Sequence, residues 1–235
     1  MRDVAIFRFS PTEGPAYFAD WLDARGIGRR LVALDEGASV PADPRAFAGI
    51  AMMGGSMSVN DPLPWVGPLA ALLRAAVAAE VPVISHCLGG QMLARALGAP
   101  VTRARETEIG WIDVEVADPA AAGEWFGGRS AFEVFQWHNE AFALPQGATR
   151  VLTNRHNPNQ AYVVDGRHIG FQCHVEMTRD LVEDWIGTGA DELPAATAGA
   201  RQSAAAIRRD LDAHVAALNG VAAAAYARWA QGLRR

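Results

Sequence analysis

One cysteine stands between two apolar segments, in a setting where a thiol could do chemistry. Cys87 follows a short apolar run, Val81 to Ile84, and precedes hydrophobic residues at helical spacing up to Leu97. This pattern predicts a buried strand that turns directly into a helix, and Gly89 and Gly90 suit a sharp turn. A thiol there would lie at a helix N-terminus, which favours the thiolate. The alternative is a buried, unreactive cysteine, so the interpretation needs a partner for the thiol.

A histidine and a glutamate two residues apart provide the expected partner. His174 and Glu176 follow an apolar, strand-like run that begins at Ile169. On an extended segment, residues two apart point to the same side, so Glu176 could orient the imidazole while His174 faces the thiol. By the same alternation, Cys173 is expected to point away into the core. The pair alone could be a solvated strand end, but together with the cysteine turn it indicates a nucleophile, a base and an orienting carboxylate.

These stretches and three others resemble the class I, or triad-type, glutamine amidotransferases, particularly stand-alone proteins similar to the amidotransferase domain of GMP synthase. Five motifs in the family's order carry the resemblance, which covers roughly residues 1 to 190. They are Met53 to Asp61 (the oxyanion loop), Val83 to Ala94 (the cysteine turn), Glu108 to Trp111, Trp137 to Pro145, and Phe171 to Glu176.

The resemblance implies a role for each matching residue. It assigns Cys87, His174 and Glu176 to a catalytic triad, and it implies that the backbone N–H groups of Gly55 and Leu88 form the oxyanion hole. It implies a substrate-binding role for Gly54, Gln91, Trp137, His138 and Asn139, with residues 137–139 forming a turn. The sequence His138-Asn139-Glu140 could suggest a metal site, but no further ligands stand at suitable spacing, so we expect no metal and no cofactor.

Three functions remain open at this stage. The first is hydrolysis of the side-chain amide of glutamine through a cysteine thioester, with ammonia released or passed to a separate synthetase. The second is hydrolysis of a γ-glutamyl peptide or γ-glutamyl amine by the same triad. His86 and Gly90 depart from the family pattern and are expected to alter the pocket wall, which favours this second function. The third is a catalytically silent binding protein, but such a protein has no chemical need for a complete triad.

The composition limits the compartment and the partners. The formal net charge is −5, and the chain contains no lysine, which excludes a Walker-type phosphate loop and Schiff-base chemistry. An acidic chain without a basic patch argues against nucleic acid or an anionic membrane as the main partner. Two cysteines do not make a disulfide framework, and the first nine residues read as a strand, not a signal peptide. No apolar run reaches membrane-spanning length. We therefore expect a cytoplasmic protein.

Strands alternate with helices in the first half of the chain, which predicts an α/β fold. The pattern predicts strands at residues 4–9, 30–34 and 49–53 and helices at about 13–25 and 68–79. Such alternation is typical of a parallel, doubly wound sheet whose ligands bind at the carboxyl ends of the strands. Short strands at 130–137, 150–152, 162–164 and 168–173 are too closely spaced for crossover helices, and residues 109–116 read as an edge strand. We predict a three-layer αβα, flavodoxin-like, mainly parallel sheet with an antiparallel extension.

The C-terminal region is predicted to be helical. Hydrophobic residues recur at helical spacing from about residue 195, with a break expected at Asn219-Gly220. We predict one amidotransferase-like domain at residues 1–190, and a helical extension at 195–235 packed on that domain. The alternative for this extension is a surface for a partner or a second copy.

Overall fold

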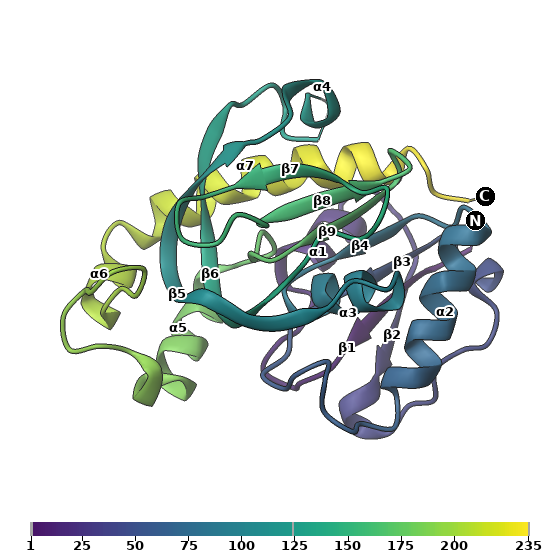
Figure 1. Ribbon diagram of the computed structural model, residues 1–235, viewed down its shortest axis with the longest axis horizontal. Coiled ribbons are helices and arrows are strands. Elements are labelled where there is room, and N and C mark those ends of the chain that lie inside the picture. Colours follow the sequence, from purple (N-terminus) through teal and green to yellow (C-terminus); the bar gives the residue numbers. More distant parts are fainter. Residues whose placement is uncertain (1, 124, 235) are drawn as a thin grey trace.

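Nine strands form one continuous sheet in the computed structural model, which describes residues 2–123 and 125–234 (Figure 1). The strand order is β2-β1-β3-β4-β9-β8-β7-β5-β6. The strands are β1 (Val4–Arg8), β2 (Arg29–Ala33), β3 (Gly49–Met52), β4 (Val83–Ser85), β5 (Val101–Val116), β6 (Ala131–Phe142), β7 (Thr149–Thr153), β8 (Ala161–Val164) and β9 (His168–Phe171).

The sheet is parallel in one half and antiparallel in the other. Strands β2, β1, β3, β4 and β9 pair in parallel, in the flavodoxin-like order. Strands β9, β8, β7, β5 and β6 then pair antiparallel. The predicted parallel sheet with an antiparallel extension is therefore confirmed. The carboxyl ends of β3, β4 and β9 lie side by side, which brings the three candidate motifs together.

Helices cover both faces of the parallel strands. The helices of the described residues are α1 (Ala16–Asp23), α2 (Val66–Ala78), α3 (Leu88–Ala96), α4 (Pro119–Ala122), α5 (Arg179–Thr188), α6 (Ala204–Arg208) and α7 (Leu211–Ala230), with short 3-10 turns at Leu34–Glu36, Pro44–Ala46 and Ala190–Glu192. Of these, α4 lies on β7 and α6 on β5 in the antiparallel half. In β1, Val4 and Ile6 pack into one core with α1, α5 and α7, whereas Ala5 and Phe7 pack into a second core with α2 and α3. This alternation produces the three-layer arrangement.

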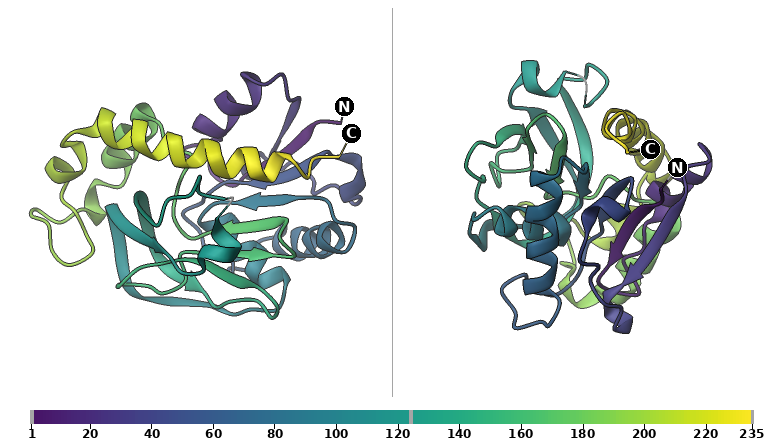
Figure 2. Two further views of the ribbon diagram at one scale, coloured as in Figure 1. Left: turned by 90° about the horizontal axis from the view of Figure 1, so that it is seen from above. Right: turned by 90° about the vertical axis from the view of Figure 1, so that its right-hand side faces the viewer.

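The C-terminal helix α7 runs along one face of the sheet and ends near the N-terminus (Figures 1 and 2). Its buried side chains, including Leu218, Val221 and Trp229, belong to the core shared with α1. The predicted break at Asn219-Gly220 is wrong, because burial of neighbouring residues stabilises the helix through a residue of low helix propensity. The chain turns instead at Asp210, whose φ is 52°. Within the described residues, no helix is both long enough and apolar enough to cross a membrane.

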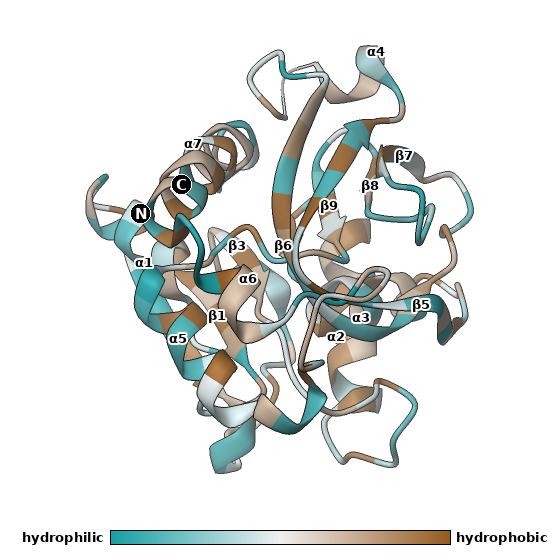
Figure 3. Ribbon diagram, turned by 90° about the vertical axis from the view of Figure 1, so that its left-hand side faces the viewer, coloured by the Kyte–Doolittle hydropathy of each residue, from teal (hydrophilic) through white to brown (hydrophobic). Residues whose placement is uncertain are grey.

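Two predictions about the antiparallel half are also wrong. Residues 109–116 are not an edge strand, since β5 starts at Val101 and lies between β7 and β6. Residues 137–139 do not form a turn, since they lie inside β6, which is the edge strand. Figure 3 shows hydrophobic and hydrophilic stretches along β6, and Val134, Phe135 and Gln136 in its middle are all buried. His138 is therefore held by a strand ladder and not by a loop.

Candidate active site

Cys87 occupies a strained turn between β4 and α3. Its φ is 46° and its ψ is −108°, a backbone conformation that side-chain-bearing residues rarely adopt. The Gly89 N–H donates to the carbonyls of His86 (2.8 Å) and Met53 (3.1 Å), and the His86 N–H donates to Met52 O (3.0 Å). These bonds tie the turn to the end of β3. The thiol of Cys87 is thereby fixed at the N-terminus of α3, as the sequence predicts.

His174 and Glu176 lie just beyond β9 and contact each other directly. The His174 Nδ1 is 2.7 Å from Glu176 Oε1, and both side chains are buried. The backbone N–H of His174 donates to Phe135 O on β6 (2.9 Å), and the indole of Trp185 packs edge-on against the ring at 4.7 Å. Cys87 contributes to the rise in the pKa of His174, so the thiol lies close to this ring. The structure brings the three predicted triad residues together.

The charges of this group favour an imidazolium. Burial acts to lower the pKa of His174, but the charges of Glu176 and Cys87 raise it well above its ordinary value. Burial acts to raise the pKa of Glu176, but the neighbouring His86 and His174 lower it to about 2. Glu176 is therefore ionised at neutral pH. The Glu176 carboxylate and a His174 imidazolium then form a buried ion pair beside the thiol of Cys87.

His86 lies behind the triad and not in the pocket wall. Its Nδ1 is 3.1 Å from Met52 O, and its Nε2 is 3.4 Å from the Tyr226 hydroxyl and 3.9 Å from Glu176 Oε2. Burial lowers the pKa of His86, with a raising contribution from the charge of Glu176. The prediction that His86 alters the pocket wall is wrong, because its side chain points into the core beside α7.

The loop after β3 lies against both His174 and the start of α3. A Cβ built on Gly54 would lie 2.7 Å from His174 Cε1 and 2.2 Å from Glu13 Oε2. A Cβ built on Gly55 would lie 2.4 Å from Leu88 Cδ2. Only residues without a side chain fit at these two positions without a shift of their neighbours.

A pocket of about 290 Å³ opens above Cys87. Five other predicted site residues line it: Gly55, Gln91, Trp137, His138 and Asn139. Gly54, Leu88, His174 and Glu176 are not part of its lining. The sequence analysis missed several other lining residues, which include Glu13, Glu140, Trp185 and Glu192. Glu13 had a usable signal, because it follows the carboxyl end of β1, where doubly wound sheets bind ligands.

Glu13 brings an unusually weakly acidic carboxyl group to this pocket. Burial raises its pKa to about 7, with a lowering contribution from the charge of His174 and a raising one from Glu176. At neutral pH this carboxyl is therefore divided between its protonated and ionised forms.

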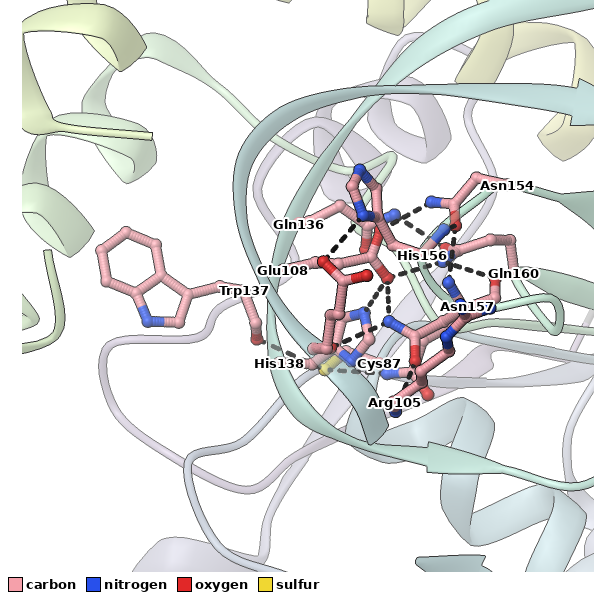
Figure 4. A network of polar contacts seen from close by, with 12 residues as sticks. Cys87, Arg105, Glu108, Gln136, Trp137, His138, Asn154, His156, Asn157 and Gln160 are labelled. Carbon is pink, nitrogen blue, oxygen red and sulfur yellow. Dashed lines mark hydrogen bonds and ion pairs between the residues drawn. The ribbon is translucent and has the colours of Figure 1, made fainter. Parts of the chain in front are cut away.

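Polar contacts fix the floor of the pocket. The Gln91 Nε2 donates to Glu140 O (3.0 Å) and to Gln172 Oε1 (3.3 Å), and Gln172 Nε2 lies 3.8 Å from Cys87 Sγ. The Cys87 thiol is 3.9 Å from Trp137 O. Only the backbone of Trp137 approaches the thiol, because its indole points away (Figure 4) and packs against Trp185 at 6.1 Å.

A buried carboxylate supports the pocket from behind His138. Glu108 on β5 is fully buried and accepts hydrogen bonds from Asn154, Asn157 and Gln160 at 2.6 to 2.8 Å. The fourth contact is with His138 Nε2 at 3.0 Å. Figure 4 shows these side chains converging on Glu108. The glutamate of the Glu-Ile-Gly-Trp motif therefore has a structural role, because it holds His138 of the pocket in place.

Gly90 permits close packing of α3 on β9 and does not line the pocket. A Cβ built on Gly90 would lie 2.2 Å from Phe171 O and 3.0 Å from Phe171 C. The prediction that Gly90 alters the pocket wall is therefore wrong. Its departure from the family pattern concerns how closely the helix approaches the backbone of β9.

We expect Gly90→Ala to destabilise the fold, because the new methyl group would push α3 away from a backbone carbonyl. Overpacking of this kind typically costs about 1 to 3 kcal/mol in the free energy of unfolding. Gly67→Ala is the matched control, since that glycine is also helical but has no atom within 4 Å of a built Cβ. Thermal and urea denaturation measure both. Equal stability of the two variants would contradict this explanation of Gly90.

Comparison with known proteins agrees with this geometry. A sequence model of the family described as glutamine amidotransferase class-I matches residues 22–183. The chain belongs to the class I glutamine amidotransferase family. The resemblance inferred from the motifs is thereby confirmed, and the family consists of enzymes that hydrolyse or transfer the amide of glutamine.

Individual class I glutamine amidotransferases cover most of the chain. The glutamine amidotransferase-like protein YfeJ of Salmonella typhimurium is 30% identical over 191 residues, which are 77% of this chain and 78% of that protein. A glutamine-hydrolyzing GMP synthase subunit of Sulfolobus acidocaldarius is 26% identical over 157 residues, which are 66% of this chain and 80% of that one. The crystal structure of a glutamine amido transferase from Methylobacillus flagellatus has a TM-score of 0.96 at 45% identity, and the match covers 100% of this chain and 96% of that chain.

Proposed function

We propose that this protein hydrolyses the side-chain amide of glutamine, with Cys87 as nucleophile, His174 as base and Glu176 as the group that orients and charges the base. The observation that carries the proposal is the contact of a buried His174–Glu176 pair with a cysteine held at φ 46° above a pocket. A structural cysteine needs neither the strained backbone nor a charged partner.

The first half of the reaction forms a thioester. The Cys87 thiolate attacks the amide carbon, and the negative charge moves to the carbonyl oxygen. We assign the backbone N–H groups of Gly55 and Leu88 to this oxyanion, because the first N–H groups of a helix have no intrahelical acceptor. When the carbon–nitrogen bond breaks, the proton of the His174 imidazolium passes to the nitrogen, which leaves as ammonia.

The second half regenerates the thiol. His174, now neutral, takes a proton from a water molecule, and the resulting hydroxide attacks the thioester carbon. The carbon–sulfur bond breaks, glutamate leaves, and the imidazolium–thiolate pair is restored. Glu176 stays ionised throughout, since its role is to hold the ring and stabilise its charge.

We expect Gly55→Val to lower turnover roughly 100- to 1000-fold, about 3 to 4 kcal/mol, the typical effect of losing one oxyanion donor. The branched side chain would displace Leu88, which carries the other proposed donor, and Met57, whose Sδ would lie 2.6 Å from the new Cβ. Steady-state assays of glutamine hydrolysis measure the effect. Alkylation of Cys87 should survive as a control, because it forms no tetrahedral oxyanion. Near wild-type turnover would remove this loop from the mechanism.

Hydrolysis of a γ-glutamyl peptide or amine by the same triad is the competing proposal. The sequence argument for this substrate class is that His86 and Gly90 alter the pocket wall, and it is weakened because neither residue lines the pocket. A panel of free glutamine and γ-glutamyl amines, compared by kcat/KM, separates the two substrate classes. Turnover of none of these compounds by the intact protein would instead support a silent binding protein.

We further propose that the ammonia is released or passes to a separate synthetase in the cytoplasm. A precedent is the Sulfolobus acidocaldarius relative, which is named as one subunit of a glutamine-hydrolyzing GMP synthase. The proposed triad, oxyanion donors and substrate-binding residues lie within residues 1–190, which we propose as the catalytic domain, and Glu192 adds to the pocket lining from just beyond it. The segment from 195 onward is proposed as an extension of that domain, consistent with the burial of α7.

A further inference from the structure

The pocket is rich in acidic groups and lacks a permanent cation. Glu13, Glu140 and Glu192 contribute to its lining, and among the described residues no arginine does so. A glutamyl substrate carries an α-ammonium group, which these carboxylates can bind, and an α-carboxylate, which they repel. Of the lining residues that the structure describes, His138 alone has a side chain that could carry a positive charge, so its protonation state decides how the α-carboxylate is bound.

Glu108, the partner of His138, is ionised. The amide oxygens of Asn154 and Asn157 accept from backbone N–H groups, which fixes both side-chain NH₂ groups toward Glu108. Asn154 then donates to one carboxylate oxygen (2.6 Å), and Asn157 donates to the other (2.6 Å). Each oxygen faces donors, which leaves no acceptor for a carboxylic proton. Burial acts to raise the pKa of Glu108, but His138 and the amide donors lower it overall.

Both ring nitrogens of His138 face acceptors. Nε2 is 3.0 Å from the Glu108 carboxylate, and Nδ1 is 2.9 Å from the carbonyl oxygen of Glu140. A neutral imidazole has one N–H and one lone pair, so either tautomer would set a lone pair against an oxygen at hydrogen-bond distance. The doubly protonated ring satisfies both contacts.

We propose that His138 is a buried imidazolium that recognises the α-carboxylate of the glutamyl substrate. The inference rests on the proposed function. The side chain of His138 is 2% exposed and that of Glu108 is fully covered, and only His138 of this pair lines the pocket, so the positive end of the pair is nearer to the ligand. Because both N–H groups are occupied, the ring acts on the ligand through its charge. Substrates with a free α-carboxylate are therefore preferred to those in which this group is amidated.

The surrounding charges are consistent with this assignment. Glu108 faces His138 from β5, Cys87 lies in the turn before α3, and the Glu140 carboxylate on β6 accepts from the Ser58 hydroxyl at 2.7 Å. These groups are acidic, and each one favours a cationic ring. Glu108 is thus a positioning residue that acts through His138.

Imidazole nitrogen NMR of the whole protein tests the charge directly. At about pH 8, where an unperturbed histidine is mostly neutral, His138 should show two protonated ring nitrogens. Loss of those signals in His138→Gln assigns them. An unprotonated nitrogen on this ring at that pH would overturn the inference whether or not the protein is active.

Kinetics test the recognition. His138→Gln keeps a donor for Glu108 but removes the charge, and it should raise KM for L-glutamine roughly tenfold with kcat within about twofold. The KM for L-glutaminamide, in which the α-carboxylate is an uncharged amide, should stay within about twofold. Glu108→Gln should reproduce this split, and if it does not fold, His138→Gln and the NMR measurement still decide.

A second histidine provides the control. His156 also lies 3.0 Å from a glutamate, Glu106, but it is not part of the pocket lining. His156→Gln should leave both KM values unchanged. An equal loss toward both substrates in His138→Gln, or no change in either, would overturn the recognition role. If the wild-type protein hydrolysed neither compound, the proposed function would fail. The NMR measurement alone would then test whether His138 is protonated.

Discussion

Replacing Cys87 by alanine is expected to lower glutamine hydrolysis by roughly 10⁶-fold, to the background rate. The thiolate is the atom that bonds to the substrate, and losing a nucleophile removes the covalent route entirely. The side chain is small and lines the pocket, so the fold should persist. A glutaminase assay with ammonia detection measures the loss, and the thermal unfolding midpoint checks the fold.

Cys173→Ala is the matched control for this substitution. Cys173 is fully buried in the core, and burial raises the pKa of its thiol well above the ordinary value. It is therefore a neutral packing group, and its replacement should cost some stability but little turnover. Equal loss of activity in the two variants at equal folded fraction would refute the assignment of the nucleophile.

His174→Ala is expected to be the second most damaging change, with turnover reduced roughly 10⁵-fold, whereas Glu176→Ala should cost about 10³- to 10⁴-fold. His174 transfers the proton in both halves of the reaction. Glu176 holds the ring through the 2.7 Å contact and stabilises its charge, so a base without this carboxylate still works poorly. Single-turnover measurements of the two variants, with circular dichroism as a check on folding, give the order. A folded Glu176→Ala that is less active than His174→Ala would reverse the two roles.

The parallel half of the fold was predictable because its signals are local. Apolar runs followed by glycine or a helical pattern mark β1, β3 and β4, and the rule that ligands lie at carboxyl strand ends places Gly55 beside Cys87. The triad was predictable for the same reason. Cys87 and the His174–Glu176 pair each follow a buried strand, and those two strands are adjacent in the sheet.

The other features of the fold and the site could not be predicted, because they depend on contacts between segments that are distant in the sequence. Residues 137–139 carry polar side chains that suggest a turn, yet pairing with β5 keeps them in a strand. Asn219-Gly220 suggests a helix break, yet the burial of α7 against the core keeps the helix intact. His86 and Gly90 stand next to the nucleophile in sequence, but one points behind the triad and the other faces Phe171. The role of Glu108 emerges only from side chains that are 30 to 52 residues away along the chain.

The central claim is that Cys87 attacks a glutamyl group in the pocket, and a labelling measurement tests it most directly. A diazo-ketone analogue of glutamine bonds covalently to an active-site thiolate. Trypsin, which cleaves after arginine, then places the two cysteines on different peptides. Cys87 lies between Arg74 and Arg95, and Cys173 lies between Arg167 and Arg179. Mass spectrometry should find the adduct on the peptide spanning 75–95, and glutamine or the true γ-glutamyl substrate should slow its formation. An adduct on the peptide spanning 168–179, or labelling of Cys87 that no glutamyl compound slows, would contradict the account.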